Sequence, residues 1–472
     1  MNRDVSRETA VAVGREHRAD GRVSRETSSA VTRRRHGLLA AAAAATIALA
    51  AAACAAPPGP QGWAPARTVR VDSQQTVLVA YKAKLFALPN ASSNATWQFP
   101  PKDKSQSPPS DAALDDLRQA AASAVSDADA IGRIEARIND LRLSGPSKDA
   151  LKSEIDASAP ADRRGKLKSL VDDTLSKEND ALKDLKAIYG DIGVAADGQT
   201  AYVGTFRGIV FALDTRDGHM RWWRDAGDGL IGGIAVDGST LYFGTKGHDI
   251  FAWDADTGEQ RWRVGADGEV WATPTVAADT VYATSLDGSV HALDKATGAR
   301  RWRFSGAGSG IGSKAVVDGD AVYVGAFDNK LYALSADTGQ MKWSFKAGNW
   351  FWATPLVRDD VVYAASLDGS VYAIDAGDGT QRWERALGSG VRSAPVFAGG
   401  GLMVASRDGR VWKLDPGSGE PSPGSPAVTG ETVLADLTAD GNEVYVVPEA
   451  RLFYVFDASR EITLPGSVPL PQ

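Results

Sequence analysis

The clearest copy of a repeated unit in this chain reads Thr280-Val-Tyr-Ala-Thr-Ser-Leu-Asp-Gly-Ser-Val-His-Ala-Leu-Asp-Lys-Ala-Thr-Gly-Ala-Arg-Arg-Trp302. The unit returns at intervals of about 40 residues, a spacing typical of a propeller or a solenoid. Its aromatic residues recur together, as Tyr202, Tyr242, Tyr282, Tyr323 and Tyr363 and as Trp222, Trp262, Trp302, Trp343 and Trp383. The period therefore decides the fold class.

Each unit has the pattern of a small antiparallel sheet. Residues 280–284 are rich in β-branched and aromatic residues, which predicts a strand. Asp287-Gly288 readily adopts the positive φ angles of a hairpin turn, and residues 289–293 return as the partner strand. A second turn at Gly298 leads to a third strand at residues 301–304, and the residues before the tyrosine supply a fourth. Such a blade buries its faces by stacking against others around an axis.

A second pattern, Ala-x-Asp-x-x-Thr-Gly-x-x-x-Trp, runs through the repeats. It is complete at residues 252–262 and 292–302, and three other copies depart from it once, at Asp217, Ser335 and Asp378. It resembles the tryptophan-docking motif of the quinoprotein (PQQ-like) β-propeller family, in which the tryptophan packs against the neighbouring blade. The resemblance implies that the structural docking residues are Trp97, Trp222, Trp262, Trp302, Trp343 and Trp383, with Gly218, Gly258, Gly298, Gly339 and Gly379.

Two further copies are degenerate. Residues 401–415 keep the hairpin but have Pro423 in place of the tryptophan, and residues 443–457 keep only the strands. Counting both predicts an all-β, eight-bladed propeller of four-stranded antiparallel blades over residues 68–472. The chain also resembles the BamB-type lipoproteins of the outer-membrane β-barrel assembly machine. A WD40 propeller is the alternative, but the Gly-His…Trp-Asp signature does not accompany the period.

The β pattern stops between residues 101 and 190. Apolar residues there follow helical spacing, first at Ile131, Ile134, Ile138 and Leu141 and then at Val171, Leu175, Leu182, Leu185 and Tyr189. They predict an α-helical hairpin inserted after the first blade. Two interpretations stay open: the two stripes pack on each other without further role, or the hairpin docks a partner, since long insertions in compact domains are often functional.

The first 32 residues are polar and contain Val-Ser-Arg-Glu-Thr twice, at residues 5–9 and 23–27. One back-translation of this echo is an inverted repeat that resembles a bacterial centromere-like DNA site. We interpret residues 1–32 as upstream DNA read as protein, with the start nearer Arg33, or as a disordered cytoplasmic tail.

Residues 33–54 have the pattern of a secretory signal, with basic residues, a short apolar run and small residues before Cys54. The end of this run resembles a lipobox, which implies lipidation of Cys54, although Ala51 stands where Leu is usual. A buried cysteine and a transmembrane helix are the alternatives. Residues 55–67 are proline-rich and predict a semi-rigid tether.

Composition narrows the function classes. The chain has a formal net charge of −7 and no stripe of positive charge, which argues against a nucleic-acid partner. One cysteine excludes an internal disulfide framework. His219, His248 and His291 lie in different repeats, and no pair has the spacing of metal ligands or of a catalytic triad. Residues 254–259 superficially resemble a calcium loop but are interpreted as a turn. We therefore expect no catalytic residues, metal or cofactor.

The family name also suggests a pyrroloquinoline quinone dehydrogenase. Those enzymes carry adjacent cysteines that form a disulfide ring, a Glu/Asn/Asp calcium site and a catalytic aspartate. The single cysteine here, Cys54, lies in the predicted signal. The resemblance is therefore limited to the docking motifs, and an enzyme is disfavoured.

One position in each repeat differs in character from the rest. Eleven residues before the strand tyrosines, or before Met403, stand Ile231, Trp271, Gly312, Trp352 and Arg392. Equivalent positions of a propeller form a ring around the axis. With two neighbouring aromatic residues they give a candidate binding set of types enriched in binding hot spots: Trp271, Trp350, Phe351, Trp352 and Arg392. The alternative is that these side chains plug the channel or pack between blades.

Together these patterns predict a monomeric, non-enzymatic scaffold that is extracytoplasmic, lipid-anchored and bound to an envelope or membrane protein partner. The family resemblance suggests a role in envelope protein assembly, an analogy at the level of fold. The alternative function is a small-molecule or quinone-binding sensor that uses the ring of Trp271 and Trp352.

Overall fold

The computed structural model describes residues 64–71, 74–81, 83–92, 94–100, 153 and 188–470. The predicted signal with Cys54, most of the tether and nearly all of the predicted helical hairpin lie outside the described residues. Within that described part of the chain, no helix is long and apolar enough to cross a membrane.

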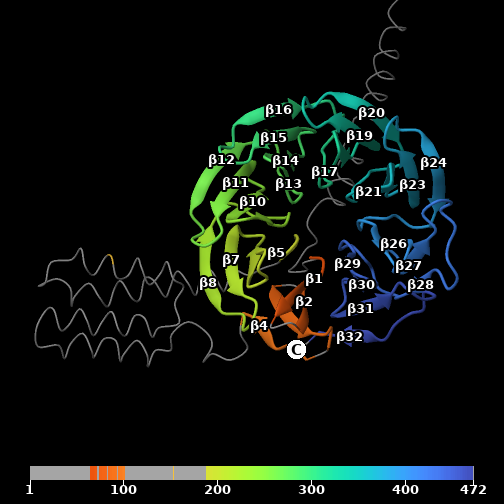
Figure 1. Cartoon of the computed structure of the whole chain (residues 1–472), viewed down its shortest axis with the longest axis horizontal. Helices are drawn as coiled ribbons and strands as arrows, with labels where there is room; N and C mark the ends of the chain where they lie inside the picture. Colours follow the sequence, from red (N-terminus) through yellow and green to blue (C-terminus); the bar gives the residue numbers. More distant parts are fainter. Residues whose placement is uncertain are drawn as a thin grey trace, which may run out of the picture. The chain divides into compact units, whose positions relative to one another are not determined.

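The described strands form eight sheets, and each sheet consists of four strands that are consecutive in sequence and antiparallel. Figure 1 shows these sheets as the blades of a ring, which we number one to eight in chain order. The all-β, eight-bladed prediction is confirmed, whereas the helical hairpin of the same prediction is not.

The first strand of each blade lies at the axis, and the fourth lies at the outer rim (Figure 1). The first strands are β1 (Arg67–Val71), β5 (Gly193–Val194), β9 (Ala235–Asp237), β13 (Thr275–Ala277), β17 (Val316–Asp318), β21 (Leu356–Arg358), β25 (Val396–Ala398) and β29 (Thr438–Asp440). The second strands are β2 (Gln74–Tyr81), β6 (Thr200–Gly204), β10 (Thr240–Gly244), β14 (Thr280–Thr284), β18 (Ala321–Gly325), β22 (Val361–Ala365), β26 (Gly401–Ala405) and β30 (Glu443–Val446).

The third and fourth strands complete the hairpins predicted from the Asp-Gly turns. The third strands are β3 (Lys84–Pro89), β7 (Ile209–Asp214), β11 (Asp249–Asp254), β15 (Val290–Asp294), β19 (Lys330–Ser335), β23 (Ser370–Asp375), β27 (Arg410–Leu414) and β31 (Leu452–Asp457). The fourth strands are β4 (Trp97–Phe99), β8 (Met220–Asp225), β12 (Gln260–Gly265), β16 (Arg300–Phe304), β20 (Met341–Lys346), β24 (Gln381–Ala386), β28 (Ala427–Val428) and β32 (Ser467–Pro469).

Burial explains the different residue patterns of these strands. Every residue of β14 is buried, because a second strand is covered on both faces by the neighbouring blades. In β16 the central tryptophan is buried, whereas the residues beside it are exposed, since the outermost strand has solvent along one side. An apolar run therefore marks the inside of a blade, and alternation marks its rim.

Tryptophans hold adjacent blades together. Trp262 donates from Nε1 to the Lys295 carbonyl of the next blade at 3.0 Å, and the Tyr242 hydroxyl donates to the same oxygen at 3.3 Å. Its ring also lies on Gly298, where an added Cβ would sit 2.9 Å from Cδ2 of Trp262 and where φ is +72°. Gly298 thus meets both demands, a left-handed conformation and close approach of an aromatic ring.

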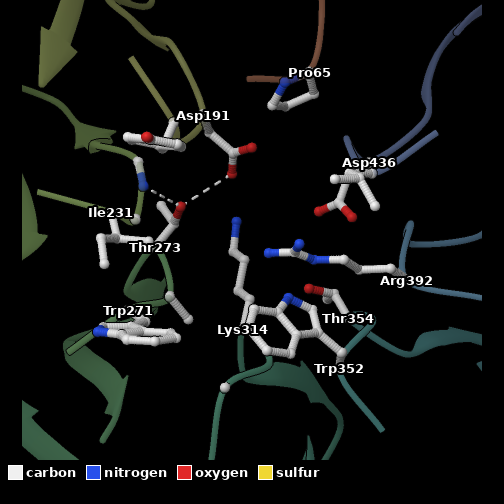
Figure 2. Close-up of a pocket in the computed structure, with 17 residues that line it drawn as sticks. Pro65, Asp191, Ile231, Trp271, Thr273, Lys314, Trp352, Thr354, Arg392 and Asp436 are labelled. Carbon is white, nitrogen blue, oxygen red and sulfur yellow. Dashed lines mark hydrogen bonds between the residues drawn. The ribbon is translucent and has the colours of Figure 1, made fainter. Parts of the chain in front are cut away.

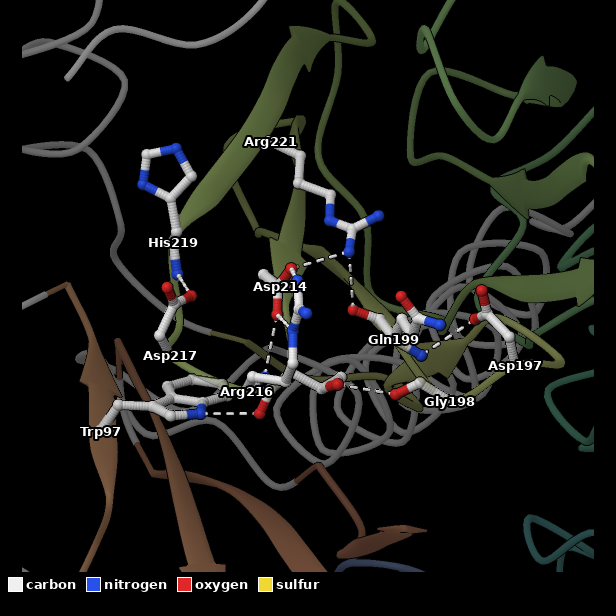
Figure 3. Close-up of polar contacts among 10 residues, drawn as sticks. Trp97, Asp197, Gly198, Gln199, Asp214, Arg216, Asp217, His219 and Arg221 are labelled. Atoms are coloured by element: carbon white, nitrogen blue, oxygen red, sulfur yellow. Dashed lines mark hydrogen bonds and ion pairs between the residues drawn. The ribbon is translucent and has the colours of Figure 1, made fainter. Parts of the chain in front are cut away.

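The same contact recurs at five other seams between blades. The remaining predicted docking tryptophans donate to a carbonyl of the following blade, as Trp97 to Thr215 (Figure 3), Trp222 to Ala255, Trp302 to Ala336, Trp343 to Ala376 and Trp383 to Pro416. Each ring packs on the glycine of the next repeat, so the glycine of the degenerate seventh blade, Gly419, receives Trp383. Gly419 is not among the docking glycines predicted from the sequence.

Turn carboxylates are occupied by backbone and arginine groups. Asp214 accepts hydrogen bonds from Arg216 and forms ion pairs with Arg216 and Arg221 at 2.8 and 2.7 Å (Figure 3), which hold the pKa of its carboxyl well below the usual range. Asp254, in the loop compared with a calcium site, accepts from the Thr257 amide and hydroxyl and pairs with Arg261. These acids therefore shape turns.

The two seams beside blade eight use other contacts. Lys413, which occupies the alanine position of the repeat, donates from Nζ to the Ala458 carbonyl at 2.7 Å. This oxygen is equivalent to the one that accepts from tryptophan elsewhere. Between blades eight and one, Gln75 donates to Asp440 at 2.8 Å and to the Tyr445 hydroxyl at 3.1 Å. The ring is thus closed by side-chain contacts between the two ends of the described propeller.

Candidate functional site

The candidate site is a cavity of about 90 Å³ where loops from all eight blades converge (Figure 2). For blades two to eight these segments lie between the fourth strand of the preceding blade and the first strand of the blade itself, and Pro65 precedes β1, so they meet at one end of the axis. Residues line the cavity in two tiers. The outer tier stands four positions before the first strands and consists of Tyr189, Ile231, Trp271, Gly312, Trp352, Arg392 and Leu434. The inner tier stands two positions before them and consists of Pro65, Asp191, Gly233, Thr273, Lys314, Thr354 and Asp436.

Three of the five residues in the predicted binding set lie together in the outer tier. The ring centroids of Trp271 and Trp352 are 6.0 Å apart, and the guanidinium carbon of Arg392 lies 4.1 Å from the Trp352 ring centroid. The Trp271 indole donates from Nε1 to Glu269 at 2.5 Å, which fixes the orientation of that ring. Aromatic faces and an arginine therefore form one side of the cavity.

Trp350 and Phe351 lie outside this cavity. Phe351 is 1% exposed and packs in the apolar core between blades five and six. Trp350 packs against Phe327, with the ring centroids 4.9 Å apart. Phe351 points away from Trp352 because adjacent side chains of an extended segment point in different directions. Trp350 shares the Phe327 ring with Trp352, whose centroid is also 4.9 Å from that ring, but it does not reach the cavity.

Tyr189 corrects the sequence analysis in another way. It was placed on the second helical stripe, but residues 188–190 are not helical, and Tyr189 lines the cavity as the outer-tier residue of blade two. Its ring packs edge-on against Phe206, with centroids 5.5 Å apart. The entry to blade two therefore begins before residue 190, the predicted end of the insertion.

Four charged side chains point into the cavity (Figure 2): Asp191, Lys314, Arg392 and Asp436. Asp191 accepts from the Thr273 hydroxyl at 3.1 Å, and Asp436 accepts from the Ala394 amide at 2.7 Å. Burial, and secondly the negative charge of Asp191, raises the pKa of Asp436 to about 6. The sequence analysis did not identify Asp191, Lys314 or Asp436.

A buried polar chain lies elsewhere, on the third strand of blade four and the turn before it. The Ser289 hydroxyl donates to Asp287 at 2.6 Å and lies 2.8 Å from Nε2 of His291. Because the serine stands between the acid and the histidine and is fully buried, its oxygen is not poised to attack a substrate. Burial, with the nearby Arg300 and Arg303, lowers the pKa of His291 to about 4, so the ring is neutral at pH 7.

The lining of the cavity differs from that of a quinoprotein site. Among the described residues, no group of three or more His, Cys, Asp or Glu side chains is arranged to hold a metal ion. His219 and His248 are exposed, in the β7–β8 turn of blade two and the β10–β11 turn of blade three. Two carboxylates, two cationic side chains and two indoles therefore define the chemistry at the axis. These residues do not fit a quinone cofactor with a calcium ion.

Comparisons with known proteins agree with this architecture. The family model described as outer membrane protein assembly factor BamB matches residues 207–312 and 287–423. BamB from Moraxella catarrhalis is 26% identical with a TM-score of 0.52, and the match covers 57% of this chain and 82% of that one. The computationally designed Ika8 protein is 18% identical with a TM-score of 0.53, over 60% of this chain and 87% of the other, and shows likeness of fold alone. No curated protein matched the chain.

Proposed function

Because this chain is a PQQ-like β-propeller of the BamB type, we propose that it is a protein-interaction scaffold of the cell envelope without catalytic chemistry of its own. The scaffold presents the loops at one end of the axis to a protein partner. The remaining blade surfaces hold these loops in fixed positions.

The observation that carries this proposal is the convergence of all eight blades on one cavity with an aromatic and arginine wall. Trp and Arg are enriched among the residues that dominate binding energy in protein interfaces. The loops are short segments between strands that are themselves locked across the seams. A surface of this kind loses little conformational entropy on binding, which favours a partner-docking role.

The proposal extends to location and partner class. We infer an extracytoplasmic monomer that is anchored to a membrane through lipid on Cys54, and a partner from the machinery that assembles envelope proteins. The segment from 101 to 190 serves as a second contact arm in this proposal. In an organism with a single membrane, assembly of outer-membrane barrels is not the role, and another membrane protein is the partner.

The test is site-specific photo-cross-linking in intact membranes. A photo-reactive amino acid replaces Trp352 at the cavity, and in a control chain it replaces Lys342, which lies on the outer strand β20. We expect discrete protein adducts from position 352 and few from position 342. Equal or absent adducts from the two positions would contradict the scaffold proposal.

A second version of each chain replaces residues 101–190 by a short Gly/Ser loop. Loss of the adducts in this version assigns the arm to the partner surface. Adducts that persist assign partner binding to the propeller loops alone. Immunoblotting of the same membranes checks that each chain is expressed and anchored.

The alternative function is a small-molecule sensor at Trp271 and Trp352. The cavity of about 90 Å³ is small beside the 300–1,000 Å³ that is usual for sites that enclose drug-sized ligands, so a quinone ring system would not be enclosed. Titration of quinones and sugars with tryptophan fluorescence as readout tests this alternative. Saturable quenching that is lost in Trp352→Leu would favour the sensor.

A further inference from the structure

We propose that the cavity at the axis binds an organic carboxylate, whose charge is held by Lys314 and Arg392 and whose apolar part packs on Trp271 and Trp352. This inference rests on the scaffold function where the carboxylate is the end of a partner polypeptide, and goes beyond it where the carboxylate belongs to a small free acid. The carboxylate belongs either to a small free acid or to the end of a polypeptide.

The hydrogen bonds formed by the charged residues of the cavity indicate the charge of its ligand. Asp191 and Asp436 each accept a hydrogen bond from the cavity wall, from Thr273 and from the Ala394 amide. The Lys314 ammonium forms no hydrogen bond or ion pair with any residue that the structure describes, although its side chain is partly buried and points to the centre (Figure 2). A partly desolvated ammonium that donates no hydrogen bond is complementary to an anion.

Arg392 supplies the second positive group. It comes from blade seven, while Lys314 comes from blade five, and both head groups reach the centre of the cavity (Figure 2). The Arg392 guanidinium is positioned by the Trp352 ring, 4.1 Å away. Its planar donors match the two oxygens of a carboxylate, which gives a directional hydrogen bond that a lone lysine lacks.

The aromatic wall separates an organic acid from an inorganic anion. Trp271 and Trp352 lie next to the cations with ring centroids 6.0 Å apart, and Nε1 of Trp271 is already bonded to Glu269. Trp271 therefore offers mainly its ring surface to a ligand. A cavity of about 90 Å³ holds several water molecules, or one carboxylate with a few carbon atoms, and the rest of a larger ligand would extend into solvent.

Asp436 makes the binding depend on pH. It faces Asp191, Lys314 and Arg392 across the cavity, and its pKa is raised to about 6, first by burial and then by Asp191. Above this pH the negative Asp436 competes with a carboxylate for the two cations. Below it Asp436 is neutral, so the affinity for a carboxylate increases as the pH falls through about 6.

The experiment is calorimetric titration of the full chain with three matched probes: phenylpropionate, its neutral amide and phenylpropylamine. We expect the carboxylate to bind about tenfold or more tightly than the amide, because charge-assisted hydrogen bonds are the stronger ones. We also expect Lys314→Met to reduce the affinity by about tenfold. The control Lys342→Met removes one positive charge from the outer strand, where Lys342 pairs with Asp320, and is expected to leave binding unchanged.

Equal affinity for the carboxylate and the amide, or tighter binding of the amine, would overturn the proposal. So would an unchanged affinity in Lys314→Met. Circular dichroism and thermal melting of each variant establish that it is folded before it is titrated. These outcomes concern the cavity chemistry and leave the cross-linking test of the scaffold independent.

A second series identifies the source of the carboxylate and tests its pH dependence. An alanine-rich peptide with a free C-terminal carboxylate is compared with its C-terminal amide: tighter binding than phenylpropionate indicates a polypeptide end, and weaker binding indicates a small acid. Between about pH 7.5 and pH 5 we expect the carboxylate affinity to rise several-fold in the natural chain. Asp436→Asn should abolish this rise, and a variant that keeps it would contradict the role of Asp436.

Discussion

Six seams between blades are fastened by a tryptophan, whereas in the described residues the two seams beside blade eight are not. At the seam between blades three and four, one carbonyl accepts from both Trp262 and Tyr242. At the seam between blades seven and eight, the equivalent carbonyl of Ala458 accepts from Lys413. The acceptor position is thus common to both kinds of seam, and the donor differs. The two kinds of seam then differ in stability, because a tryptophan buries a much larger packing area than a lysine.

The largest effect is expected when the tryptophan of one seam is removed, in Trp262→Ala. Trp262 is 8% exposed, so the substitution removes a buried indole, leaves a cavity and deprives the Lys295 carbonyl of a donor. We expect the free energy of unfolding to fall by about 3 to 5 kcal/mol. Urea denaturation monitored by circular dichroism measures the change. Trp262→Phe keeps much of the packing and should cost clearly less; equal costs would mean that packing is not the main term.

A fall in pH should destabilise one of the tryptophan-fastened blades, because blade four contains the buried His291. Its pKa is about 4 in the folded chain and about 6.5 when unfolded. The unfolded chain therefore binds the proton first as the pH falls from 6.5 to 4, and stability is lost in this window, by up to about 3 kcal/mol. Denaturation of the natural chain and of His291→Gln across this range isolates the contribution. Parallel pH profiles for the two chains would refute it.

Gly298→Ala tests the close approach of the tryptophan ring to the next blade. The added Cβ would lie 2.9 Å from Trp262, and φ is +72°, so both overlap and backbone strain oppose it. We expect a loss of about 2 to 3 kcal/mol, measured by thermal denaturation. Gly319→Ala is the matched control, because φ is +55° there and nothing lies within 4 Å of the new Cβ. It should cost about 1 kcal/mol, from strain alone.

The smallest effect is expected at a seam without tryptophan. Lys413→Met retains the apolar stem but removes the ammonium that donates to the Ala458 carbonyl. We expect a loss of about 1 kcal/mol, since the side chain is partly exposed and water can replace part of the bond. Denaturant titration gives the value. A loss as large as that of Trp262→Ala would show that the lysine seam depends on one hydrogen bond more than the tryptophan seams do.

The sequence predicted the features that repeat. The blades, their hairpins and the tryptophan positions recur in every regular unit, so local propensity and period agree on them. The cavity was predicted in part for the same reason: Trp271, Trp352 and Arg392 stand at one repeated offset. The inner tier stands two residues further on, but Asp191, Lys314 and Asp436 differ from one blade to the next, so no period marks them.

Other contacts had no signal in the sequence. The acceptors of the seam hydrogen bonds are backbone carbonyls, which leave no trace in side-chain identity at Lys295 or Ala336. Lys413 occupies a position that the motif gives to alanine, so its reach across the seam follows from geometry alone. Trp350 and Phe351 were grouped with the axis because of their neighbour Trp352. Phe351 alternates into the apolar core between blades, and Trp350 packs on Phe327 short of the cavity, a contact that sequence spacing does not predict.

The contiguity of the blades has a topological consequence. In the described propeller each sheet is a single uninterrupted run of four strands, and the join between β29–β32 and β1–β4 is made by non-covalent contacts, among them the hydrogen bonds of Gln75 and a shared apolar cluster. None of the described sheets borrows a strand from the opposite terminus, so the chain can be cut between two blades without dividing a sheet. A circular permutant that starts at β9 and links β32 to β1 would build the same ring with its ends moved by two blades.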